Sequence, residues 1–102
     1  MSKIAQRMSE ILAEGLGCRS TLFAENCSEN SCYVRLNRYP PCPNFPEAYG
    51  LVPHTDSDFL TVLYQDQLGG LQLLKNGEWI NVNPNEDALI ISVGDLFEVL
   101  PN

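Results

Sequence analysis

Apolar residues near the start of the chain recur at the spacing of one helix face. They are Ile4, Met8, Ile11, Leu12 and Leu16, with polar residues between them. Because residues three and four apart share a helix face, the pattern predicts an amphipathic helix over residues 3–16. Gly15 and Gly17 are expected to end this helix, since glycine readily adopts the left-handed conformation found at helix ends.

From residue 31 onward the pattern changes to short apolar stretches separated by turn residues. A polar connection rich in serine and asparagine, residues 18–31, is expected before them. Strands are predicted over residues 32–39, 50–55, 60–64, 71–74, 78–82 and 88–93. Asn76-Gly77 predicts a hairpin turn in which both residues need positive φ. The dense prolines of Pro40-Pro41-Cys42-Pro43 predict a rigid loop that cannot pair as a strand.

One helix followed by successive short strands predicts a mainly β fold: a sandwich, barrel or jelly roll with the helix packed outside the sheets. At 102 residues the chain is at most one ordinary domain, and it buries a core only if its layers close on one another. We expect an N-terminal helix and connection over residues 1–30 and a β domain over residues 31–102.

Composition limits the classes of partner. The formal net charge of −7 argues against nucleic acid and anionic membranes, because both need a positive protein surface. No apolar run approaches the roughly 20 residues that span a bilayer, and the start does not resemble a signal peptide, so we expect a cytoplasmic protein. The four cysteines match no common zinc spacing, and free thiols are expected rather than two disulfides.

The chain contains one histidine, His54, two residues before Asp56. In an extended segment such residues project from the same face, so the imidazole and the carboxylate can converge on one ion. This geometry suits two ligands of the two-histidine, one-carboxylate triad that holds non-haem Fe(II). The spacing alone is weak, because an acidic residue lies two positions from a given histidine about one time in eight by chance. A surface histidine is the alternative.

Polar side chains alternate along the first predicted strand. Arg35, Asn37 and Tyr39 would present a cation, an amide and a phenol on one face, with Val34 and Leu36 on the other. Such a face can simply be solvated. Beside a metal pair, it could also bind an anionic cosubstrate through hydrogen bonds.

Several stretches in order carry a family resemblance. They are RLNRYPPCP from Arg35, GLVPHTD from Gly50, LTVLYQD from Leu60, GGLQL from Gly69 with Trp79, and Asn83-Pro84 leading to Gly94-Asp95-Leu96. From Ser31 to about Phe97 the chain resembles the plant 2-oxoglutarate- and Fe(II)-dependent dioxygenases, whose fold is a jelly roll, or double-stranded β-helix. The segment GLVPHTDSDFLTVLYQDQ is most similar to the gibberellin 2-oxidases, which inactivate the hormone gibberellin by hydroxylation at carbon 2.

The resemblance implies roles for individual residues. His54 and Asp56 would be the first two iron ligands. Asn37 and Tyr39 would line the 2-oxoglutarate pocket, with Tyr39 in direct contact and Arg35 in a supporting role at most. The implied cofactors are Fe(II), 2-oxoglutarate as cosubstrate and O2, with release of succinate and CO2. The implied partner is a small, gibberellin-like substrate.

Relatives continue beyond the segment that resembles Gly94-Asp95-Leu96-Phe97, and there they carry a distal histidine and an Arg-x-Ser pair. Neither feature follows that segment in this sequence, and Arg7, Arg19 and Arg38 all lie upstream of it. We therefore expect a C-terminally truncated fragment, the N-terminal part of the dioxygenase domain with an incomplete jelly roll, inactive by itself. The alternative is a non-catalytic remnant that acts, if at all, as an interaction module. The exact substrate and the oligomeric state are left open.

Overall fold

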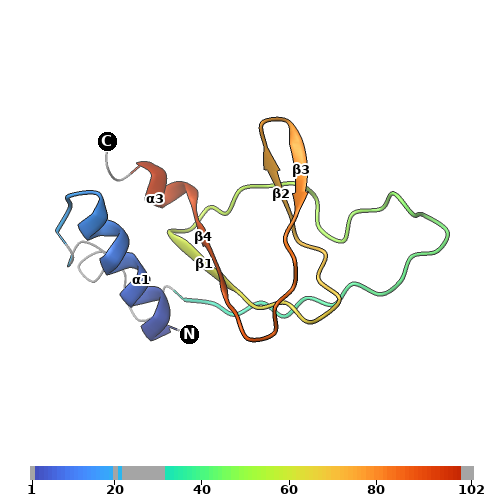
Figure 1. Cartoon of the computed structure of the whole chain (residues 1–102), viewed down its shortest axis with the longest axis horizontal. Helices are drawn as coiled ribbons and strands as arrows, with labels where there is room; N and C mark the ends of the chain where they lie inside the picture. Colours follow the sequence, from blue (N-terminus) through green and yellow to red (C-terminus); the bar gives the residue numbers. More distant parts are fainter. Residues whose placement is uncertain (1, 20, 22–31, 100–102) are drawn as a thin grey trace. The chain divides into compact units, whose positions relative to one another are not determined.

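The computed structural model describes residues 2–19, 21 and 32–99. The chain divides into two compact units, Ser2–Thr55 and Asp56–Asn102, which Figure 1 colours along the sequence. The expected boundary between residues 30 and 31, and most of the expected connection over residues 18–31, lie outside the described residues.

The N-terminal unit begins with α1, Ser2–Gly15, which confirms the predicted helix. Its end is closed by two backbone hydrogen bonds. The amide of Cys18 donates a hydrogen bond to the carbonyl of Ala13 at 2.9 Å. The amide of Gly17 donates one to the carbonyl of Glu14 at 3.0 Å. Gly17 has a φ of 74°. This combination is the Schellman motif, which satisfies carbonyl groups that the last helical turn leaves without partners.

Residues 32–55 form irregular chain, so the strands predicted over residues 32–39 and 50–55 are wrong. The alternating pattern predicts which side chains would share a face, but a strand also needs a neighbour for its amide and carbonyl groups. The described part of this unit contains no such neighbour. Val34 and Leu36 are accordingly 84% and 94% exposed. The proline-rich stretch forms the predicted loop.

The C-terminal unit is built around the antiparallel pair of β1, Leu60–Leu63, and β4, Ile90–Val93 (Figure 1). Opposite each other stand Leu60 and Val93, Thr61 and Ser92, Val62 and Ile91, and Leu63 and Ile90. All of β1 is half-buried. Both strands lie within predicted strand ranges, and the pairing places one polar pair, Thr61 and Ser92, within an otherwise apolar ladder.

The connection from β1 to β4 carries a hairpin of β2, Gln72–Lys75, and β3, Glu78–Asn81 (Figure 1). Asn76 and Gly77 form its turn with φ of 53° and 81°, which confirms the predicted turn. Positive φ at both positions matches the twist of the two strands.

After β4 the chain turns into the short helix α3, Asp95–Val99, in which Phe97 is buried. An N-terminal helix followed by antiparallel strands agrees with the predicted architecture, and closure of a jelly roll stays a prediction. Among the described residues, no helix has the length and apolar character needed to cross a bilayer.

We expect Gly77→Ala to lower the free energy of unfolding of the chain by about 1 kcal/mol, because alanine is strained in the left-handed conformation. Urea unfolding would measure the loss. The matched control is Gly15→Ala in α1, where an added Cβ meets nothing within 4 Å. That change should stabilise the helix by roughly 0.5–1 kcal/mol. Equal effects of both substitutions would contradict the proposed role of the turn.

Candidate functional site

The carboxylate of Asp56 is held by two hydroxyl groups. Its Oδ2 accepts a hydrogen bond from Thr61 Oγ1 at 2.6 Å and another from Ser92 Oγ at 3.1 Å, both in half-buried surroundings. Thr61 and Ser92 are direct partners across β1 and β4. Directly opposite residues project from the same face of an antiparallel pair, so the pairing brings both hydroxyls to one oxygen.

The backbone of the same segment is fixed at the start of α3. The amide of Asp95 donates a hydrogen bond to the carbonyl of Asp56 at 2.8 Å. The amide of Gly94 donates one to the carbonyl of Phe59 at 2.8 Å. A Cβ at Gly94 would overlap the carbonyl oxygen of Asp58 and lie 3.0 Å from that of Asp56. Because backbone atoms cannot move aside as a flexible side chain can, only glycine fits at position 94.

His54 belongs to the N-terminal unit and is exposed. Its Nδ1 lies 2.8 Å from the carbonyl oxygen of Val52. A carbonyl only accepts hydrogen bonds, so the proton lies on Nδ1, and in the neutral ring Nε2 then carries the lone pair. Metal-binding histidines commonly donate one ring N–H to a carbonyl in this way. Thr55 alone separates His54 from Asp56 in the chain.

The residues predicted to bind the cosubstrate lie in the irregular part of the N-terminal unit. The ring of Tyr39 packs against Gly50, where an added Cβ would stand 2.6 Å from the ring carbon Cδ1. This contact brings Tyr39 beside the segment that leads to His54. Arg35 and Asn37 are exposed, and the strand face predicted to unite them with Tyr39 does not form.

His54 and Asp56 supply part of the ligand set of a non-haem Fe(II) site. An imidazole nitrogen and a carboxylate oxygen are two of the ligand types that bind non-haem Fe(II). In residues 2–19, 21 and 32–99, no group of three or more His, Cys, Asp or Glu side chains could hold a metal ion. Within the described chain, the cysteines Cys18, Cys32 and Cys42 are free thiols, as predicted. Cys27 lies outside the described residues.

Sequence reasoning did not assign a role to Thr61, Ser92 or Gly94. The one available signal was Ser92, a hydroxyl within the nearly continuous apolar run of residues 88–93. A polar residue in a buried strand needs a hydrogen-bond partner. The partner, Asp56, stands 36 residues earlier in the chain.

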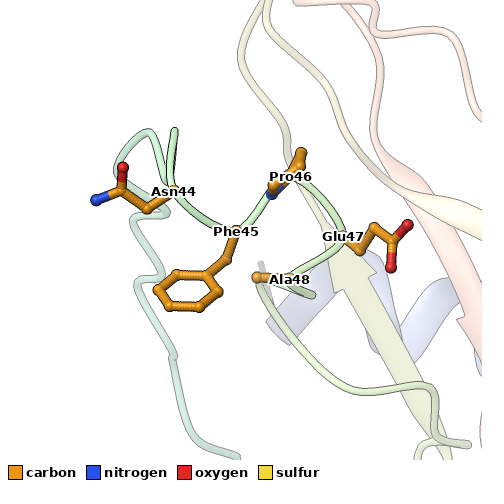
Figure 2. Close-up of a pocket in the computed structure, with 5 residues that line it drawn as sticks. All are labelled: Asn44, Phe45, Pro46, Glu47 and Ala48. Carbon is orange, nitrogen blue, oxygen red and sulfur yellow. The ribbon is translucent and has the colours of Figure 1, made fainter.

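None of these residues lines the hollow in the N-terminal unit that Figure 2 shows. Its lining consists of consecutive loop residues, Asn44, Phe45, Pro46, Glu47 and Ala48. Figure 2 shows the side chains of Asn44 and Glu47 on opposite sides of the loop. Because no polar groups converge there, the hollow lacks the usual features of a small-molecule site.

Residues 30–102 match the family described as the 2OG-Fe(II) oxygenase superfamily. The chain belongs to this family. Its members use Fe(II), 2-oxoglutarate and O2, which confirms the predicted family and its cofactors.

Proteins similar to this chain include several whose names refer to gibberellin. The chain is 61% identical to gibberellin 2-beta-dioxygenase 8 of Arabidopsis thaliana, with 97% of this chain and 29% of that protein covered. It is 49% identical to gibberellin 2-beta-dioxygenase 6 of Oryza sativa subsp. japonica, with 100% of this chain and 30% of that protein covered. Gibberellin 20 oxidase 1-B of Triticum aestivum is 38% identical to the chain, with 100% of this chain and 28% of that protein covered. The chain therefore spans about three tenths of the length of these curated relatives.

We expect Gly94→Ala to displace the backbone at Asp56 and to lower the free energy of unfolding by about 1–3 kcal/mol, as overpacking does. The amide resonance of Asp95, which reports its hydrogen bond to Asp56, should shift in NMR spectra. As a contrast, Gly50→Ala should shift the ring resonances of Tyr39 and leave the amide of Asp95 unchanged. An unshifted Asp95 amide in Gly94→Ala would contradict this packing.

Proposed function

We propose that this chain contributes part of the iron and cosubstrate site of a dioxygenase that hydroxylates a gibberellin at carbon 2. The observation that carries the proposal is the carboxylate of Asp56, which accepts two hydroxyl hydrogen bonds at 2.6 and 3.1 Å. Carboxylates that ligate metals are typically held by such outer partners. The substrate is inferred from relatives named gibberellin 2-beta-dioxygenases, which are 61% and 49% identical.

In this proposal His54, through Nε2, and Asp56 hold the metal. The hydrogen bond between His54 Nδ1 and the carbonyl of Val52 orients the ring and selects its tautomer. Bound Fe(II) supplies the activation of O2, coupled to decarboxylation of 2-oxoglutarate to succinate and CO2 and to hydroxylation of the substrate. The chain's own part is to hold the ligands in position before the reactants arrive.

The same proposal assigns 2-oxoglutarate to Tyr39 and Asn37. A phenol O–H and an amide N–H both donate to carboxylate oxygens. Packing of the Tyr39 ring on Gly50 limits the positions that its hydroxyl can reach, and so supports direct contact by this residue. Arg35 adds a positive charge on the same segment, which favours the approach of a dianion without a specific contact.

A second candidate function, a protein-binding module, is favoured by the β2–β3 hairpin. Leu73 and Ile80 form an apolar pair on one of its faces, and Leu74 and Trp79 form another pair on the opposite face. The four side chains are 52%, 46%, 58% and 46% exposed, in that order. Apolar surface on both faces of one hairpin is typical of a segment that other polypeptide covers.

An activity assay separates the two functions. It uses a protein as long as the relatives that includes residues 1–102, together with Fe(II), O2, 2-oxoglutarate and a gibberellin. We expect one succinate per gibberellin hydroxylated at carbon 2, measured by mass spectrometry. Asp56→Asn and His54→Ala should each lower turnover by more than about 100-fold, since loss of outer partners alone costs 10- to 100-fold.

Asp87→Asn in an exposed turn is the matched control and should retain activity. Full activity of Asp56→Asn would refute the metal assignment. Succinate release with no gibberellin product would refute the substrate alone. No turnover, together with capture of a partner that Trp79→Ser abolishes, would favour the binding module.

A further inference from the structure

We propose that Thr61 and Ser92 are positioning residues for Asp56: their hydroxyls hold Oδ2 and so fix the orientation of the carboxylate that is offered to the metal ion. This inference rests on the proposed function, because it concerns the carboxylate that we assign to the metal. Nothing in the family resemblance assigns these two residues.

The geometry of the two contacts is specific. Both hydroxyls reach the same oxygen, at 2.6 Å from Thr61 and 3.1 Å from Ser92. An ionised carboxylate oxygen has about two lone-pair positions, so two donors occupy those of Oδ2. The plane of the carboxylate is thereby fixed by two contacts on one oxygen.

The two donors are placed by tertiary structure. Thr61 follows Asp56 by five residues, whereas Ser92 follows it by 36. They meet only because β1 and β4 pair in the register that sets Thr61 opposite Ser92. The orientation of the carboxylate is therefore as rigid as the strand pair that carries its donors.

Fixing the carboxylate favours metal binding. The terminal torsion of an aspartate is broad, so an unrestrained carboxylate must be ordered when the ion binds. A group already held in the bound orientation avoids that entropy cost. Removal of a hydroxyl should therefore weaken metal binding more than it weakens folding.

The test measures Mn2+ binding by electron paramagnetic resonance, since Mn2+ accepts carboxylate and imidazole ligands. It uses a protein as long as the relatives that includes residues 1–102. We expect Thr61→Val and Ser92→Ala each to raise the Kd at least about 10-fold, the lower limit for outer partners of a ligand. Thr61→Ser keeps the hydroxyl and should bind Mn2+ as the unaltered chain does. This rescue separates loss of the hydroxyl from loss of side-chain packing.

Ile91→Val is the matched control, because it removes one methylene group from β4 on the face opposite Ser92. Urea unfolding of every variant reports how much of each effect is stability. A Kd that rises as much in Ile91→Val as in Ser92→Ala would overturn the positioning role, and so would an unchanged Kd in both hydroxyl variants.

Failure of the proposed function gives a different result. If this protein of full length binds no Mn2+ before any substitution, or binds it equally well after Asp56→Asn, Asp56 is no ligand and both proposals fall. If Asp56→Asn and His54→Ala abolish binding while Thr61→Val and Ser92→Ala do not change it, the proposed function stands and only the positioning role is overturned.

Discussion

The register of β1 against β4 determines where the carboxylate of Asp56 can point. Side chains alternate between the two faces of a strand, so a shift of one residue in either strand would move its hydroxyl to the opposite face. Val62 and Ile91 are half-buried partners on that opposite face, and their burial disfavours such a shift. Apolar packing on one face of the pair thus stabilises polar geometry on the other.

Features encoded by neighbouring residues were predictable. The helix predicted over residues 3–16 is observed as Ser2–Gly15, because its apolar spacing and terminal glycines act within a few residues. The Asn76-Gly77 turn is of the same kind, since positive φ is a property of those two positions. The strands predicted over residues 32–39 and 50–55 failed because alternation is local whereas strand pairing is not.

The same distinction applies to the candidate site. Residue type and spacing drew attention to His54 and Asp56, and the family resemblance implied their roles as iron ligands. Family membership supports that choice without testing it. The donors on Asp56 could not be read from the sequence, since the contact with Ser92 depends on a register formed 36 residues away. The need for glycine at position 94 is equally hidden, because the carbonyl groups that exclude a Cβ approach it only in the folded chain.

The hairpin within the β1–β4 connection also has a consequence for the order of folding. Contacts between residues close in sequence form with little loss of chain entropy, whereas joining β1 to β4 must close the whole connection. Formation of β2–β3 shortens that connection before the distant strands meet. The hydroxyls that bind Oδ2 of Asp56 therefore come together late, and a partly folded chain would have its hairpin before the carboxylate is held.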